Sequence, residues 1–165
     1  MNALRPIADF GTGISTNRQW ELFISIVDNG NPKYVSTTPH LGRFEMSVRR
    51  LCDLGFMTNP KRFRRVDRLV WSADWVPPYS LAGFLQNTEW QRNAFLLSMS
   101  GYAKTPALTS LVGYEVEGEQ VTFSGVLAVA HRAGENGAIS WFINPKDRRK
   151  FAKTTELFKR ANRVF

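Results

Sequence analysis

Apolar residues recur with helical spacing in several parts of the chain. Near its start, four of them follow the i, i+3, i+4, i+7 pattern that places side chains on one face of a helix: Trp20, Phe23, Ile24 and Val27. The pattern predicts an amphipathic helix over residues 17–28, which Gly30 ends. Asp28 is then a carboxylate in the last turn of this helix.

Other apolar stretches predict a mainly helical chain. Further helices are expected over residues 45–53, 88–99 and 124–132, then as a short helix bearing Trp141 and Phe142, and finally from about Asp147. Four details of these helices can be stated in advance. We expect a capping box between Thr88 and Gln91, an N-cap at Ser124, a helix end at Gly134 and a buried Phe151.

Between the helices, the chain carries turn-forming and basic segments. Residues 33–44 are rich in Ser, Thr, Pro and Gly, which predicts an irregular segment or a short hairpin. Residues 59–65 are basic and contain Pro60, so we expect a loop or a short turn of helix at the surface there. The double proline that closes residues 70–78 predicts an interruption of regular structure. Residues 114–123 alternate apolar and acidic side chains, which favours a small hairpin or an extended loop.

The composition is that of a globular protein. The chain has 165 residues, 43% of them hydrophobic, and this predicts a single domain over residues 1–165. Cys52 is the single cysteine, so no internal disulfide is expected, and its apolar surroundings in sequence predict a buried, inert thiol rather than a nucleophile. His40 and His131 are far apart and lack zinc-ligand spacing. We therefore expect no metal and no cofactor.

No segment predicts membrane insertion or export. The longest apolar run, residues 126–130, is too short to cross a bilayer, and residues 1–6 lack the apolar core of a signal peptide. We expect a soluble, monomeric protein with no membrane span.

The chain carries a net charge of +8, which favours anionic polymers as partners. Anionic envelope polymers and nucleic acids both fit this charge, and so does a cationic surface that is merely solvated. The basic cluster over residues 61–68 contains no recognisable nucleic-acid motif, so no specific nucleic-acid partner is expected. A second basic cluster occupies the last predicted helix, over residues 148–163.

Two separated segments suggest a more specific function. The first runs from Val27-Asp28-Asn29-Gly30 to His40-Leu41-Gly42-Arg43-Phe44-Glu45-Met46, and the second is Ala128-Val129-Ala130-His131-Arg132-Ala133-Gly134. In this order they resemble the active-site frame of lysozyme-like peptidoglycan glycosidases, the soluble lytic transglycosylases and phage-type muramidases. The resemblance covers residues 20–138. It implies a mainly α (α+β lysozyme-like), two-lobed fold with a small β element beside a cleft.

The resemblance also implies roles for individual residues. Asp28 falls where the family has its catalytic Glu, and Ser36 falls on the family's Ser. Gly42 lets the backbone approach the substrate, Arg43 and Phe44 follow it in the same turn, and Gly134 closes the last motif. A glycosidase needs a carboxylic acid that stays protonated in apolar surroundings. By itself, an Asp before Asn-Gly is typical of a turn, and Asp is one methylene shorter than Glu.

Two of these residues allow alternative interpretations. Glu45 stands where the family usually has Gln: it either shares the acid or base work with Asp28 or stabilises the N-terminus of the helix expected over residues 45–53. His131 either helps to position the catalytic carboxyl and the sugar or is a core histidine. Phe44 is expected to be a core aromatic under the cleft rather than a sugar-stacking platform.

The leading hypothesis is therefore an enzyme that cleaves the bond between N-acetylmuramic acid and N-acetylglucosamine in peptidoglycan glycan strands. Such an enzyme would be delivered to the periplasm or cell wall from a phage virion or from the host cytoplasm. The alternative is a catalytically weak or inactive protein of the same fold, either glycan-binding or a structural part of a virion. A nucleic-acid-binding protein is the third hypothesis and rests on charge alone.

Overall fold

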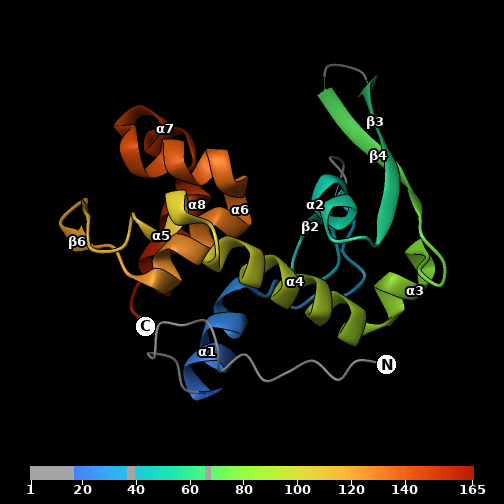
Figure 1. The fold of residues 1–165 in the computed structure, drawn as a ribbon, viewed down its shortest axis with the longest axis horizontal. Coiled ribbons are helices and arrows are strands. Elements are labelled where there is room, and N and C mark those ends of the chain that lie inside the picture. The colour runs from blue at the N-terminus through green and yellow to red at the C-terminus, as the bar shows by residue number, and fades with distance from the viewer. Residues whose placement is uncertain (1–16, 37–39, 66–67) are drawn as a thin grey trace. The chain divides into compact units, whose positions relative to one another are not determined.

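The computed structural model describes residues 17–36, 40–65 and 68–165, and in this part of the chain it is mainly helical with three small antiparallel sheets (Figure 1). This confirms the prediction of a mainly α fold. The helices are α1 (Asn17–Val27), α2 (Val48–Asp53), α3 (Leu81–Gln86), α4 (Thr88–Ala103), α5 (Pro106–Thr109), α6 (Phe123–Ile143), α7 (Pro145–Lys150) and α8 (Ala152–Ala161). The strands are β1 (His40–Leu41), β2 (Met46–Ser47), β3 (Met57–Arg65), β4 (Arg68–Trp75), β5 (Glu115–Val116) and β6 (Glu119–Gln120).

The chain divides into two compact units. One contains α1 together with residues 99–165, and the other contains residues 28–98. Asp28 is therefore the first residue of the second unit, directly after α1. Each unit has its own core.

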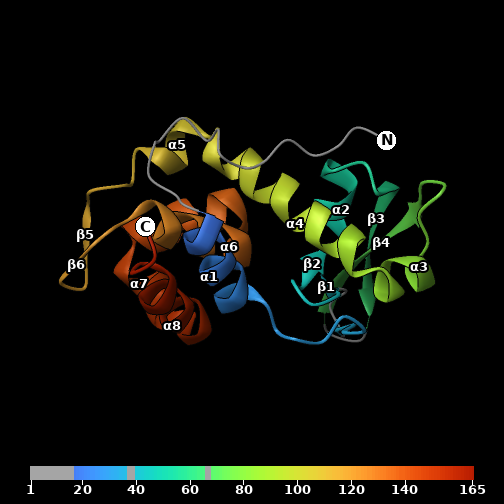
Figure 2. The same cartoon turned by 90° about the horizontal axis from the view of Figure 1, so that it is seen from below.

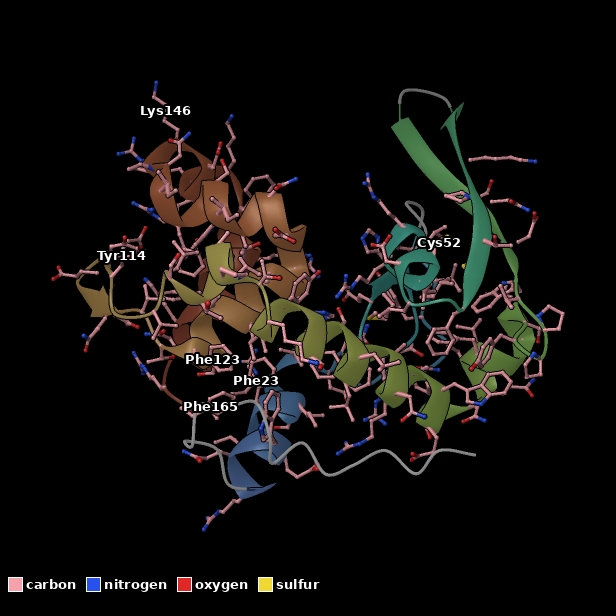
Figure 3. All side chains as sticks on the ribbon, in the orientation of Figure 1. Phe23, Cys52, Tyr114, Phe123, Lys146 and Phe165 are labelled. Carbon is pink, nitrogen blue, oxygen red and sulfur yellow. The ribbon has the colours of Figure 1, made fainter. Side chains whose placement is uncertain are left out.

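In the unit of α1 and residues 99–165, α6 is the central element and packs against α5, α7 and α8, while α1 packs against α8 (Figure 2). All residues from Phe123 to Ala130 are buried. The C-terminal Phe165 closes this core, because its ring lies 5.1 Å from Trp20, 5.8 Å from Phe23 and 6.3 Å from Phe123 between ring centroids (Figure 3). The apolar stripe predicted for α1 is thus buried against the end of the chain.

A buried amide joins α8 to the start of α6. Asn162 accepts a hydrogen bond from the backbone N–H of Thr122 at 2.7 Å and donates one to the carbonyl of Gln120 at 2.8 Å. Gly125 lies against this amide so closely that an added Cβ would meet Asn162 Oδ1 at 2.3 Å. Position 125 therefore has no room for a side chain.

The ends of the helices in this unit differ in part from the sequence prediction. Thr122, and not Ser124, is the N-cap of α6: its hydroxyl accepts from the N–H of Gly125 at 3.3 Å. Ser124 is buried instead, with Oγ 2.6 Å from the carbonyl of Ala161. The predicted break at Gly134 is confirmed, since this residue has φ 72° and interrupts α6. Phe151 was expected to be buried within the last helix but is 53% exposed, and it lies at the non-helical junction between α7 and α8.

The hairpin predicted within residues 114–123 is confirmed. Strands β5 and β6 pair antiparallel, Glu115 with Gln120 and Val116 with Glu119. Val116 is buried, Glu115 and Glu117 are exposed, and Glu119, which lies opposite Val116, is partly covered. The alternation of the sequence produced this result directly, because successive strand residues face opposite sides.

In the unit of residues 28–98, α2 packs against the long hairpin of β3 and β4. Arg50 ties α2 to α4, since its guanidinium donates to the hydroxyl of Ser98 at 2.8 Å and to the Ser98 carbonyl at 3.0 Å. The core continues under α3 as a cluster of aromatic rings in mutual contact: Phe56, Trp75, Tyr79, Phe84 and Trp90.

The hairpin β3–β4 corrects two predictions. The expected surface loop over residues 59–65 is a strand, and the expected interruption over residues 70–78 begins only after Trp75. The pair runs from Met57 opposite Trp75 to Arg65 opposite Arg68. The register shifts between Thr58 and Lys61, where Asn59 has φ 50° and Pro60 has no N–H to donate. The turn residues that suggested a loop thus form a bulge within a strand.

A β element forms near the predicted residues 33–44. It consists of two strands of two residues each, and the second strand lies beyond the predicted range, at Met46–Ser47. Strand β1 pairs with β2 through His40 opposite Ser47 and Leu41 opposite Met46, and Val35 forms an isolated bridge with Leu41. The following helix is shorter than predicted: α2 begins at Val48 with Ser47 as its N-cap. Likewise, α4 is capped by Asn87, whose side-chain oxygen accepts from the N–H groups of Glu89 and Trp90, and the expected capping box does not form.

The contact of Gly125 with Asn162 predicts a specific stability effect. We expect Gly125→Ala to lower the free energy of unfolding by about 2 kcal/mol, because overpacking of this size costs about 1–3 kcal/mol. In an Asn162→Ala background the same substitution should cost less, since the clash with the amide is gone and only the contact of the added Cβ with Phe158 Cε2 at 2.9 Å remains. Urea denaturation of the four proteins measures this coupling. Equal costs in both backgrounds would contradict the assignment.

Candidate functional site

Asp28 is held by a local turn at the end of α1. Its Oδ1 accepts a hydrogen bond from the N–H of Gly30 at 2.8 Å, and Gly30 has φ 76°. The next residues repeat this turn, because Asn29 accepts from the N–H of Asn31 at 2.8 Å and Asn31 from that of Lys33 at 3.0 Å. Short polar side chains that bond to the backbone two residues on are typical of such turns. The Asp28 side chain therefore has one fixed oxygen and one oxygen available to a partner.

Arg43 is that partner. Its Nε donates to Asp28 Oδ2 at 2.8 Å, and its Nη2 also donates to Oδ2. The backbone adds a further link, since the N–H of Asn29 donates to the carbonyl of Arg43 at 2.8 Å. The side chain of Asp28 is only 11% exposed, whereas that of Arg43 is 35% exposed. The segments around residues 28 and 43, which both contribute to the family resemblance, thus form one polar cluster.

The ion pair determines the protonation of Asp28. Burial raises the pKa of this carboxyl, but the hydrogen bonds from Arg43 and from the Gly30 N–H, together with the charge of Arg43, lower it further than burial raises it. The net effect is a pKa below the usual value, so Asp28 is a carboxylate at neutral pH. The pKa of Arg43 is raised in turn, mainly by its hydrogen bond to Asp28. The apolar surroundings that a proton donor needs are replaced here by a guanidinium.

Glu45 belongs to the same cluster. Its Oε1 accepts a hydrogen bond from Asn29 Nδ2 at 3.3 Å, and its backbone is left-handed, with φ 49°. Because α2 begins at Val48, Glu45 does not lie in the first turn of a helix, and the helix-stabilising interpretation is wrong. A non-glycine residue in this backbone region is held there by its surroundings and is often found at functional sites. Asn29 therefore links Glu45 to the Asp28–Arg43 pair: its side chain donates to Glu45, and its backbone N–H donates to the carbonyl of Arg43, whose guanidinium binds Asp28.

A buried glutamine that the sequence prediction had assigned to a helix cap supports the whole turn. Gln91 on α4 is completely buried. Its Oε1 accepts from the N–H of Arg43 at 2.8 Å, while its Nε2 donates to the carbonyls of Phe84 at 2.7 Å and Pro32 at 3.0 Å. Gly42 lies directly on this amide, where a Cβ would come within 2.5 Å of Oε1. Gln91 thus holds three chain segments around the Asp28–Arg43 pair.

The expectation for Phe44 is confirmed: it is a core residue. Its side chain is 2% exposed and its ring stacks on Phe95, with centroids 4.5 Å apart and an interplanar angle of 17°. The guanidinium carbon of Arg43 lies 5.7 Å from the centroid of the Phe44 ring. The Phe44 ring therefore packs in the core beside the Asp28–Arg43 pair.

Ser36 is hydrogen-bonded to His40. Its hydroxyl accepts from the N–H of His40 at 2.9 Å and lies 3.3 Å from His40 Nδ1. Residues 37–39 between them lie outside the described residues. The role that the resemblance implies for Ser36 stays a prediction.

His131 and Gly134 belong to the unit of α1 and residues 99–165. His131 follows the fully buried stretch of α6 and is itself half-buried, and Gly134 ends the first part of that helix. The His131 side chain is thus more exposed than the five residues before it, Val126 to Ala130, which are completely buried. The expected cleft between Asp28 and His131 stays a prediction.

Several other classes of site find no support among the described residues. No group of three or more His, Cys, Asp or Glu side chains in this part of the chain is placed to hold a metal ion. Cys52 was expected to be buried but is partly exposed; desolvation, and then the charge of Asp53, raises the pKa of its thiol, which disfavours the reactive thiolate form. None of the described helices is long and apolar enough to cross a membrane. Comparisons with protein-family models, curated proteins and solved structures give no match for this chain.

The Gly42–Gln91 contact can be tested with a matched pair of variants. Gly42 and Gly30 both have positive φ, 71° and 76°, but only Gly42 has an atom within reach of an added Cβ. We expect Gly30→Ala to lower the free energy of unfolding by about 1 kcal/mol, from backbone strain alone. Gly42→Ala should cost about 2 kcal/mol more, because the Gln91 amide must also move. Urea denaturation of both variants gives the comparison, and equal costs would argue against it.

The Asp28–Arg43 pair predicts a pH-dependent stability. A lowered pKa in the folded state stabilises the fold above roughly pH 4, the usual Asp value, and the contribution disappears as the pH falls through the lowered pKa. We expect Asp28→Asn to reduce the free energy of unfolding at pH 7 by about 1–2 kcal/mol, discounted because Arg43 is partly exposed. Denaturation curves from pH 7 to pH 2 should show the two proteins converging. A difference that stays constant with pH would contradict this.

Proposed function

We propose that the protein is a lysozyme-like glycosidase that acts on peptidoglycan glycan strands, cleaving the bond between N-acetylmuramic acid and N-acetylglucosamine. The observation that carries this proposal is the polar cluster at the end of α1, where Arg43 binds Asp28 through its guanidinium, and Asn29 bonds to the Arg43 carbonyl and to Glu45. The residues of this cluster are those on which the resemblance to lytic transglycosylases and phage-type muramidases rests. A lysozyme-like architecture is part of the same proposal.

Two carboxylates with different protonation states are what glycosidic cleavage requires. Asp28 is kept ionised by Arg43, which suits a carboxylate that stabilises the positive charge developing on the sugar ring. In this proposal Glu45 donates the proton to the leaving oxygen. Asp28 takes that role only if the sugar displaces Arg43. Arg43 and Gln91 position the carboxylates, and His131 contributes from the second motif.

The activity implies a place and a partner for the protein. A peptidoglycan glycosidase works in the periplasm or at the cell wall, as a bacteriolytic or envelope-penetrating agent released from a phage virion or from the host cytoplasm. Its net charge of +8 would assist binding to anionic envelope polymers.

A second candidate function has one observation in its favour. The guanidinium of Arg43 lowers the pKa of Asp28 and keeps this carboxyl ionised. An ionised carboxylate cannot donate a proton, although Asp28 stands at the position where the resembling family has its catalytic acid. A protein with this arrangement can bind glycan strands without cutting them. The second proposal is therefore a glycan-binding or virion structural protein with little or no catalytic activity.

Analysis of muropeptides released from purified peptidoglycan separates these proposals. Reducing ends mean hydrolysis, 1,6-anhydro ends mean transglycosylation, and sedimentation with the wall without release means a binding protein. If the protein is an enzyme, we expect Asp28→Asn and Glu45→Gln each to reduce the release rate by at least about 100-fold, the usual contribution of an acid or base. Glu21→Gln is the matched control: it changes an exposed carboxylate on α1 and should leave the rate unchanged.

A further inference from the structure

Helix α7 is attached to the rest of its unit by one side only. Asp147 accepts a hydrogen bond from the hydroxyl of Ser140, and Arg148 donates to the carbonyls of Trp141 at 3.0 Å and Phe142 at 2.7 Å. These two residues are partly covered, whereas no residue of α7 is fully buried. The inner side of α7 is therefore polar and engaged, and its outer side faces solvent.

The outer side of α7 is basic. Lys146, Arg149 and Lys150 are exposed, and Arg149 and Lys150 follow Lys146 by three and four residues, which places both beside it on one face of the helix. Lys146 projects away from the ribbon in Figure 3. Lys153 continues the exposed basic run into α8. Asp147 is the single acidic residue between positions 143 and 153: its Oδ2 accepts from Ser140 on the inner side, and its Oδ1 lies 3.8 Å from the Lys150 ammonium.

Two exposed apolar residues flank the basic residues of α7 in sequence. Ile143 directly precedes the cap of α7 and is 70% exposed, and Phe151 directly follows the helix and is 53% exposed. Single exposed apolar residues are common on protein surfaces. Here two large ones lie on either side of a helical turn that carries three cations. This combination is characteristic of surfaces that bind the boundary between lipid headgroups and acyl chains.

We propose that residues 143–153 form a docking surface for an anionic lipid bilayer. The basic side chains would bind phosphate headgroups, while Ile143 and Phe151 enter the apolar layer beneath them. A soluble phosphate polymer or a nucleic acid satisfies the charges equally well, but it offers no apolar phase for Ile143. The apolar residues therefore favour a membrane surface. This surface is separate from the Asp28 cluster, and the proposal does not depend on glycosidase activity.

The test is sedimentation of the protein with vesicles of phosphatidylcholine alone and with vesicles in which half the lipid is phosphatidylglycerol. We expect binding to the anionic vesicles that weakens with salt, and little binding to the neutral ones. Each basic residue near such a surface contributes about a fivefold change in affinity, so Lys146→Gln with Arg149→Gln should weaken binding by at least about tenfold. Lys33→Gln with Lys104→Gln, two exposed lysines elsewhere, removes the same charge as a control.

The apolar residues give the decisive comparison. Ile143→Ser with Phe151→Ser should weaken vesicle binding by at least about tenfold, the effect of withdrawing one large side chain from an apolar phase. The control is Val112→Ser with Tyr114→Ser, which removes a pair that is 43% and 60% exposed in the same unit. Thermal denaturation checks that all variants are folded.

Two results would overturn the proposal. In the first, the Lys146→Gln, Arg149→Gln variant loses vesicle binding, the Ile143→Ser, Phe151→Ser variant binds vesicles as well as the parent does, and the parent binds a soluble polyphosphate as tightly as it binds the anionic vesicles. That result would make the surface a site for phosphate polymers. The second is equal binding of both test variants and their controls.

Discussion

The hydrogen bonds of Gln91 are the interaction on which the unit of residues 28–98 depends. A fully buried amide must satisfy both its oxygen and its nitrogen, because an unpaired buried polar group costs about 1–3 kcal/mol. Gln91 does so with three backbone groups from three different segments, at Pro32, Arg43 and Phe84. The loop after α1, the turn before β2 and the end of α3 are therefore positioned by a single side chain of α4. The site residues follow from this arrangement, since Arg43 can reach Asp28 only from that turn.

In the other unit, too, a buried side-chain amide holds separate chain segments together through hydrogen bonds to the backbone. Asn162 is buried at the end of α8 and bonds to backbone groups of Thr122 and Gln120, so the hairpin β5–β6 and the start of α6 are held together. Each amide lies against a glycine that leaves it room, Gly42 in one unit and Gly125 in the other. A buried polar group of this kind contributes specificity, because alternative packings would leave it unsatisfied. The two glycines are required by close approach, and only Gly42 also has positive φ.

The candidate site combines features that the proposed glycosidase chemistry requires with one that opposes this chemistry. Asp28 and Glu45 lie in one hydrogen-bonded cluster, and the left-handed backbone of Glu45 is held at a local energetic cost. The guanidinium of Arg43, however, lowers the pKa of Asp28. A substrate that displaced Arg43 would remove the stabilising hydrogen bonds and raise the pKa of Asp28 in the partly buried site. The position of Arg43 thus decides which of the two proposed functions the cluster can perform.

Local patterns in the sequence determined a large part of the secondary structure. The helical period of Trp20 to Val27 produced α1, the alternation around Val116 produced β5 and β6, and Gly134 ended the first part of α6, because each signal acts over one or two turns of chain. Asp28 and Glu45 were also identifiable as candidates from sequence. Tertiary structure decided what depends on distant partners: the pairing of β3 with β4 across a bulge at Asn59–Pro60, the burial of Gln91 and the charge state of Asp28. These outcomes depend on backbone groups and charges brought together by folding, and the types of neighbouring residues along the chain do not specify them.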